Sequence, residues 1–129
     1  MKRLCLVTLI LLFTSEISHA REYKVRKSAG GYVIEMRINR NPPVVDKNIL
    51  TLNIRDGNGK YVTDAQVMVN YYMPPMPGMP PMNYKTYAQL SGREYKATMD
   101  LIMSGPWNIV IKITRTGKTF PVRFAIDVR

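Results

Sequence analysis

The sequence predicts an all-β protein, an antiparallel β-sandwich of about seven strands, from three observations. Apolar and polar residues alternate through most of the chain, as they do in a strand with one buried face. Residues typical of turns interrupt this alternation at intervals of about 8–12 residues. No stretch shows a helical apolar stripe of useful length. Two sheets that share a single apolar core satisfy all three observations.

Three of the expected strands lie in the first half of the chain. Residues 32–38 alternate up to an Asn-Pro-Pro break at residues 41–43, where proline ends the strand. Residues 50–55 follow and end at an Asp-Gly-Asn-Gly turn at residues 56–59, because glycine and asparagine tolerate positive φ. Residues 65–71 form the third strand.

Four more strands are expected in the second half. They are residues 84–90, the weakest of the set, and residues 94–101, 107–113 and 120–128. A short glycine-containing turn separates each of the last three from the segment before it. The number and spacing of the strands favour an immunoglobulin-like sandwich without its disulfide, so that the core is held by packing alone.

The N-terminus has the pattern of a signal peptide. Lys2 and Arg3 precede an apolar run at residues 4–13, which is too short to span a bilayer comfortably. Ser-His-Ala at residues 18–20 supplies a small-x-small cleavage site. We expect a cleaved signal peptide at residues 1–20 and a periplasmic or secreted protein, with an uncleaved N-terminal anchor as the alternative.

Cleavage leaves a linker or a frayed first strand at residues 21–30 and one sandwich domain at residues 31–129. It also removes Cys5 and His19, the only cysteine and the only histidine. Disulfides, zinc sites of the usual Cys/His type and catalysis by Ser-His-Asp or Cys-His are then excluded. No carboxylate pair stands out from the turns, so we expect a protein that is not an enzyme.

The chain is strongly basic, with a formal charge of +10 that falls to +9 when Lys2, Arg3 and Glu16 leave with the signal peptide. Such a field favours anionic partners, including a membrane surface. Most of the charges, however, alternate with apolar residues along strands, where a solvated sheet face explains them better. An exported protein seldom meets nucleic acid, so we expect no nucleic-acid partner.

Residues 73–82 are the most distinctive segment, because methionine recurs at every third position on a proline frame. The four are Met73, Met76, Met79 and Met82. Proline prevents both a helix and a central strand here. A thioether is a soft ligand that favours Cu(I), and we expect Cu(I) or Ag(I) as the metal if one binds. In a straight polyproline helix, however, these residues stand roughly 9 Å apart along one edge, too far to chelate one ion.

A bend in the loop resolves this spacing. Pro77 and Gly78 suit the central positions of a type II turn, which would bring Met76 and Met79 together. We add Met103 as a third candidate ligand and Trp107 as a ring that could cap a cation through its face, so that these two complete the candidate metal site.

Packing and docking explain the same residues about equally well. Met103 and Trp107 also fit core residues in sulfur–aromatic contact, and for Trp107 we favour the core because it starts a strand with inward periodicity. The loop also fits a seal over one end of the sandwich or an apolar patch that docks on a partner protein. Tyrosines at positions 71, 72, 84 and 87 flank the loop and fit either an aromatic recognition surface or rigid walls for the loop.

The order of several short motifs resembles the YtkA-like domain, which is similar to the periplasmic domain of FixH-type proteins. The resemblance covers roughly residues 31–128. The motifs are Asp56-x-x-Gly59, Asp64-Ala65-x-Val67, the methionine-proline run from Met73 to Met79, Gly92-x-x-Tyr95-x-Ala97 and Met103-x-Gly105-x-Trp107.

This resemblance implies an exported sandwich that serves as an accessory protein in metal handling of the bacterial envelope. FixH-type proteins are associated with assembly of a copper-containing terminal oxidase, and other members with metal efflux. The resemblance therefore implies an envelope efflux or oxidase-assembly protein as the partner. The chain departs from FixH-type proteins in lacking their longer membrane helix.

Overall fold

A computed structural model of the chain describes residues 22–129, and the expected signal peptide with its cleavage site lies outside these residues. The described residues form nine strands, and none of them lies in a helix that is long and apolar enough to cross a membrane. The strands are β1 (Tyr23–Ala29), β2 (Tyr32–Ile38), β3 (Asp46–Arg55), β4 (Gln66–Tyr72), β5 (Asn83–Tyr87), β6 (Gln89–Ser91), β7 (Glu94–Leu101), β8 (Gly105–Arg115) and β9 (Lys118–Val128).

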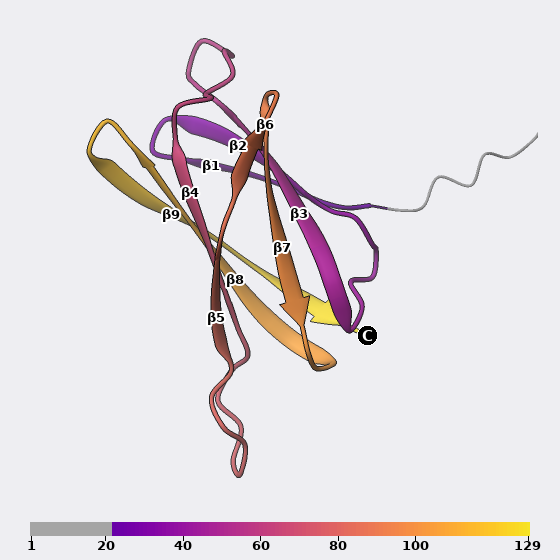
Figure 1. Ribbon diagram of the computed structural model, residues 1–129. Coiled ribbons are helices and arrows are strands. Elements are labelled where there is room, and N and C mark those ends of the chain that lie inside the picture. Colours follow the sequence, from indigo (N-terminus) through magenta and orange to yellow (C-terminus); the bar gives the residue numbers. More distant parts are fainter. Residues whose placement is uncertain (1–21) are drawn as a thin grey trace, which may run out of the picture.

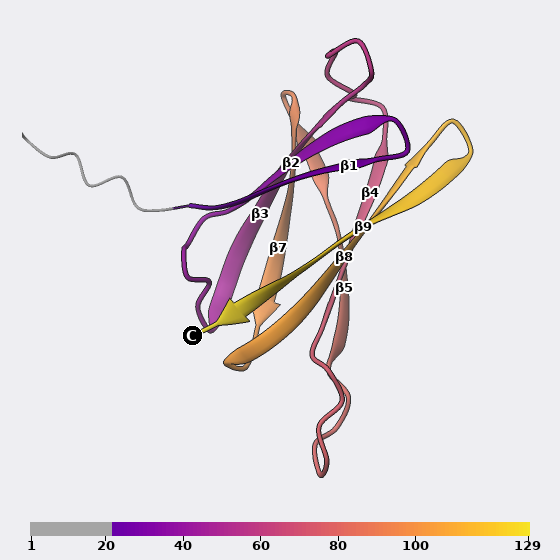
Figure 2. The same cartoon turned by 180° about the vertical axis from the view of Figure 1, so that it is seen from behind.

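The strands form two antiparallel sheets packed face to face (Figures 1 and 2). One sheet has the order β1-β2-β3-β7-β6 and the other has the order β5-β4-β8-β9. The all-β antiparallel sandwich expected from the sequence is confirmed, and the described residues contain no cysteine that could form a disulfide. An immunoglobulin-like topology stays a prediction.

Two more strands are present than the seven expected from the sequence. Residues 23–29, expected as a linker or a frayed first strand, form an edge strand that pairs with β2 along its whole length. Residues 84–90 are not one strand, because the chain changes sheets at Ala88. Its N–H donates to the carbonyl of Val67 in the four-stranded sheet at 2.9 Å, and the next residue already pairs with β7 in the other sheet.

The core lies between the sheets and consists of the alternating apolar residues that the sequence indicates. Tyr32 of β2 and Phe120 of β9 are only partly buried, and their rings stack at 5.2 Å. The largest fully buried side chains are Trp107, Tyr95, Ile34, Met36, Ile38, Leu50, Leu52, Ile54, Met99, Leu101, Ile109 and Ile111.

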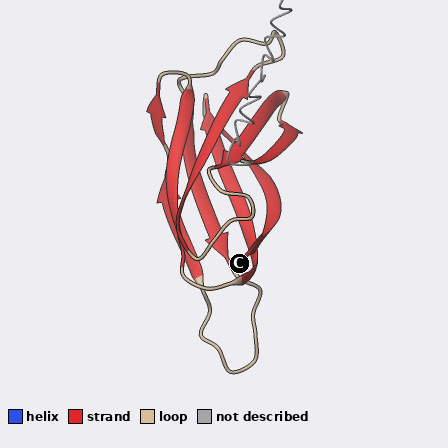
Figure 3. Ribbon diagram, turned by 90° about the vertical axis from the view of Figure 1, so that its right-hand side faces the viewer, coloured by secondary structure: helices blue, strands red, loops and turns tan. Residues whose placement is uncertain are grey.

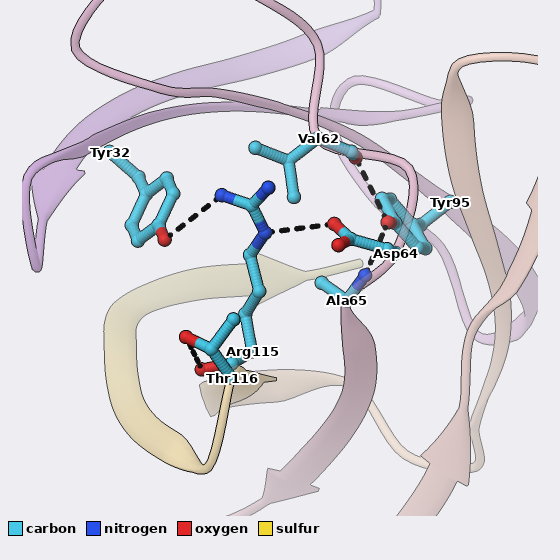
Figure 4. A network of polar contacts seen from close by, with 7 residues as sticks. All are labelled: Tyr32, Val62, Asp64, Ala65, Tyr95, Arg115 and Thr116. Carbon is cyan, nitrogen blue, oxygen red and sulfur yellow. Dashed lines mark hydrogen bonds and ion pairs between the residues drawn. The ribbon is translucent and has the colours of Figure 1, made fainter.

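A polar network joins the two sheets at the end where β4 begins and β8 ends (Figure 4). Arg115 of β8 donates from Nε to Asp64 at 2.8 Å and from Nη1 to the hydroxyl of Tyr32 in β2 at 3.2 Å. These hydrogen bonds raise the pKa of Arg115 above its ordinary value, and the bond to Tyr32 contributes most. The guanidinium is therefore the charged donor in this network.

Tyr95 makes a second connection at the same end. Its hydroxyl donates to the carbonyl of Val62 at 2.9 Å and accepts the N–H of Ala65 at 3.1 Å (Figure 4). The segment before β4 is thereby fixed to β7 of the opposite sheet. Burial raises the pKa of Tyr95, since the phenolate would lose its hydration there.

The Tyr95→Phe variant is expected to lose about 1–3 kcal/mol of unfolding free energy in urea titrations at neutral pH, because the carbonyl of Val62 and the N–H of Ala65 lose their partner. Tyr87 is 63% exposed, and Tyr87→Phe is the matched control with an expected change below about 0.5 kcal/mol. Equal stability of the two variants would contradict a structural role for the Tyr95 hydroxyl.

The raised pKa of Tyr95 also predicts a dependence of stability on pH. The folded state keeps the phenol protonated, so this contribution is complete below the ordinary tyrosine pKa of about 10 and is lost as the pH rises through the folded pKa. Urea titrations across this alkaline range should show a smaller fall in unfolding free energy for Tyr95→Phe than for the parent chain. The unfolding free energies of the parent chain and of Tyr87→Phe should fall by the same amount over this range.

Candidate functional site

Residues 73–82 connect β4 to β5 and extend beyond the end of the sandwich opposite to the Arg115 network (Figures 1 and 3). The N–H of Met73 donates to the carbonyl of Met82 at 3.1 Å and closes the base of the loop. The N–H of Met79 donates to the carbonyl of Met76 at 3.2 Å and closes its tip. Gly78 has φ of +78°, so the expected type II turn is confirmed.

The four methionines are divided into an exposed pair and a covered pair. Met76 and Met79, at the tip, are 38% and 37% exposed. Met73 is only 5% exposed and belongs to the core, and Met82 packs partly buried against the same core. We call Met76, Met79 and the turn between them the methionine tip.

The covered position of Met73 depends on a glycine that the sequence analysis assigned only to a turn. The methyl carbon of Met73 lies 3.1 Å from the place that a Cβ atom on Gly105 would occupy. Gly105 also has φ of +121°, which side chains rarely adopt. Gly105 therefore makes room for the methyl group of Met73. No local pattern in the sequence signals this contact, because the two residues lie far apart in the chain.

Methionines and prolines of the loop enclose a small hollow of about 10 Å³, roughly one water-sized sphere. Its lining is Met73, Pro74, Pro75, Met76, Met79, Pro80, Pro81 and Met82. All four methionines contribute to this lining, although the core holds the covered pair. A hollow of this size is too small for an organic ligand.

Trp107 occupies the core position that the sequence favoured, and not the position of a cation cap. It is fully buried, and its indole N–H donates to the carbonyl of Met103 at 2.9 Å. The rings of Tyr71 and Tyr84 lie 6.0 and 6.3 Å from its own. Because its ring is covered by protein, the expectation that Trp107 caps a metal ion is corrected. Met103 packs partly buried against the core behind it.

The four flanking tyrosines do not form one surface. Tyr71 is buried and Tyr84 is partly buried, and their rings stack at 5.5 Å beside Trp107. Tyr72 and Tyr87 alternate with them along β4 and β5 and so lie on the outer face of the sheet. Tyr71 and Tyr84 thus support the base of the loop, whereas Tyr72 and Tyr87 lie on a face that a partner could contact.

The surroundings of the methionine tip are unsuited to hard metal ions. Residues 65–84 contain no charged side chain. Within residues 22–129, no group of three or more histidine, cysteine, aspartate or glutamate side chains is placed to hold a metal ion. The thioethers are therefore the soft donors that the tip can offer.

Replacing Gly78 by valine is expected to open the turn at the tip, because a β-branched residue at positive φ is strained by about 1–2 kcal/mol. A Cβ atom at Gly78 would meet nothing within 4 Å, so the effect comes from the backbone alone. Amide hydrogen exchange of Met79 should accelerate about tenfold, in line with a loss of that size. Gly57→Val is the control, since Gly57 has open space and no positive φ, and it should leave Met79 unchanged.

Comparison with known proteins gives one match. The model of the YtkA-like family matches residues 27–112, which extend from β1 into β8 and include the whole Met/Pro loop. Neither a curated protein nor a solved structure matches the chain significantly.

Proposed function

The chain belongs to the YtkA-like family, and from this premise we propose that it is an exported, non-catalytic accessory protein of envelope metal handling that binds Cu(I) or Ag(I) through its Met/Pro loop. The observation that carries the proposal is the exposure of Met76 and Met79 on the two sides of one hydrogen-bonded turn. The long side chains, with three rotatable bonds each, can converge on one ion. Similarity to FixH-type proteins and export by a signal peptide are parts of this proposal.

The chemistry of the tip favours a soft monovalent ion. Neutral thioethers bind Cu(I) and its analogue Ag(I) and have little affinity for hard cations. The absence of charge over residues 65–84 also disfavours divalent hard cations, which need carboxylate oxygens. Once the signal peptide is removed, no thiolate or imidazole of the same chain competes with the thioethers for the metal.

A second function is favoured by a different property of the same loop. Its tip combines two exposed methionines with exposed prolines and no charge, which is typical of an adaptable docking surface. In this alternative, the tip docks on a membrane efflux or oxidase-assembly complex without metal. Docking would then depend on the volume and polarizability of the methionine side chains and not on their ability to bind a metal ion.

One variant distinguishes the two functions. The double variant Met76→Leu/Met79→Leu keeps the volume of the tip and removes its sulfur donors. In the parent protein labelled with ¹³C at the methionine methyl groups, Ag(I) should shift the NMR signals of Met76 and Met79 strongly and those of the buried Met36 and Met99 little. The double variant should lose affinity for Cu(I), measured by competition with a chromophoric chelator, by about 100-fold or more, as expected when two ligands are removed.

The control for this titration is Met68→Leu, since Met68 lies on the outer face of β4 away from the loop. The control should retain the parent affinity. Undiminished Cu(I) affinity in Met76→Leu/Met79→Leu would refute the loop site. Co-purification with an envelope complex, unchanged in that same variant and without metal, would support the docking function in its place.

A further inference from the structure

The methionine tip supplies two donors to a metal ion that takes more. Thioethers are neutral and weak ligands, so two of them leave a Cu(I) ion with open coordination positions, whereas a closed soft-metal site is tetrahedral. The tip of one chain is therefore an incomplete site. This step rests on the function proposed above.

The two covered methionines also line the small hollow of the loop, but the core holds them at its base, where they are poorly placed to complete a site at the tip. Met73 is 5% exposed, and its methyl group lies against Gly105 in the core. Met82 is fixed to Met73 by the hydrogen bond at the base of the loop, and its side chain packs against the same core. Bringing either sulfur to the tip would withdraw apolar surface from the core, at about 25 cal/mol for each Å² exposed.

The tip is also accessible to another molecule. It lies at the far end of a loop that extends beyond both sheets, so a partner can approach it without meeting the body of the sandwich (Figures 1 and 3). Tyr87, an exposed aromatic residue, lies on β5 and not in the loop.

A second copy of the chain would supply two more thioethers of the same kind, and the absence of charge at the tip permits it as that partner. The chain carries a formal charge of +10, and two such bodies repel each other in general. The nearest charged residues in the sequence, Asp64 and Lys85, lie outside the loop, and none occurs between them. Two tips can therefore meet where like-charge repulsion is weakest, with the charged bodies held apart by the length of two loops.

We propose that Met76 and Met79 of two chains share one Cu(I) ion, the two tips being related by a two-fold axis through the metal. Four thioethers then form a tetrahedral set. Each chain contributes the same surface to an isologous contact. The exposed prolines beside the methionines meet across the axis and exclude water from the metal.

The proposal predicts a dimer that depends on the ratio of metal to protein. The test uses the protein as purified from the envelope of its expression host, with its mass determined, and with Cys5→Ser introduced if the mass shows that the N-terminal segment is retained. Ag(I) is the probe, because it does not oxidise. Analytical ultracentrifugation should show monomer without metal and a doubled mass at half an equivalent of Ag(I). Monomer should return at a large excess, when each tip binds an ion of its own.

Two proline variants separate the contact between tips from the binding of metal. Pro75 and Pro80 are exposed on either side of the tip. Pro75→Lys/Pro80→Lys places four positive charges around the shared ion, within one Debye length of one another, and should weaken dimerisation about tenfold or more. Pro75→Gln/Pro80→Gln loses the same prolines without the charge and should dimerise like the parent. Lower ionic strength should weaken dimerisation of the lysine variant further and leave that of the glutamine variant unchanged.

The outcomes separate this inference from the proposed function. Methyl shifts at Met76 and Met79 that saturate at one ion per chain, with monomer at every ratio, would overturn the shared site and leave metal binding intact. A dimer that persists in Met76→Leu/Met79→Leu would overturn it as well, since that contact would need no sulfur. If no methyl group shifts, both proposals fail.

Discussion

The contact between Met73 and Gly105 is the constraint on which the character of the loop depends. It joins the first residue of the loop to the first residue of β8, and it holds the base of the loop against a core that includes Trp107. With the base fixed and closed by a hydrogen bond to Met82, the remaining residues must extend into solvent. One contact therefore divides four equivalent methionines into two that seal the sandwich and two that face outward. The sequence left open whether the methionines of this loop are packed or exposed, and the structure shows two of each.

Strand positions and their inward faces could be predicted from the sequence, because each strand has one buried face and the period of two is read directly from the residues. The change of sheet at Ala88 could not be predicted in the same way. It depends on a hydrogen bond to Val67, twenty-one residues earlier, and not on any local signal. The turn at Gly78 was predictable because its chemistry is local, whereas the burial of Met73 was not, because Gly105 lies thirty-two residues away.

The motifs that carry the family resemblance serve mainly the fold. Tyr95 fixes the segment before β4 through the N–H of Ala65, and Asp64 binds Arg115 at the same end of the sandwich. At the opposite end Trp107 fills the core. Membership of the YtkA-like family therefore accounts for the scaffold, and function must be argued from the loop that the scaffold presents.

The prolines of the loop restrict its backbone to few conformations. Five of its ten residues are proline, so its backbone has few conformations to lose when the tip binds a metal or a second chain. Proline also removes N–H donors, which leaves the side chains of Met76 and Met79 as the adaptable part of an otherwise stiff tip. Leucine on the same frame would keep about the same volume and remove the sulfur. In the proposed metal-binding function methionine is needed for its thioether, whereas in the docking alternative its adaptable, polarizable side chain is the useful property.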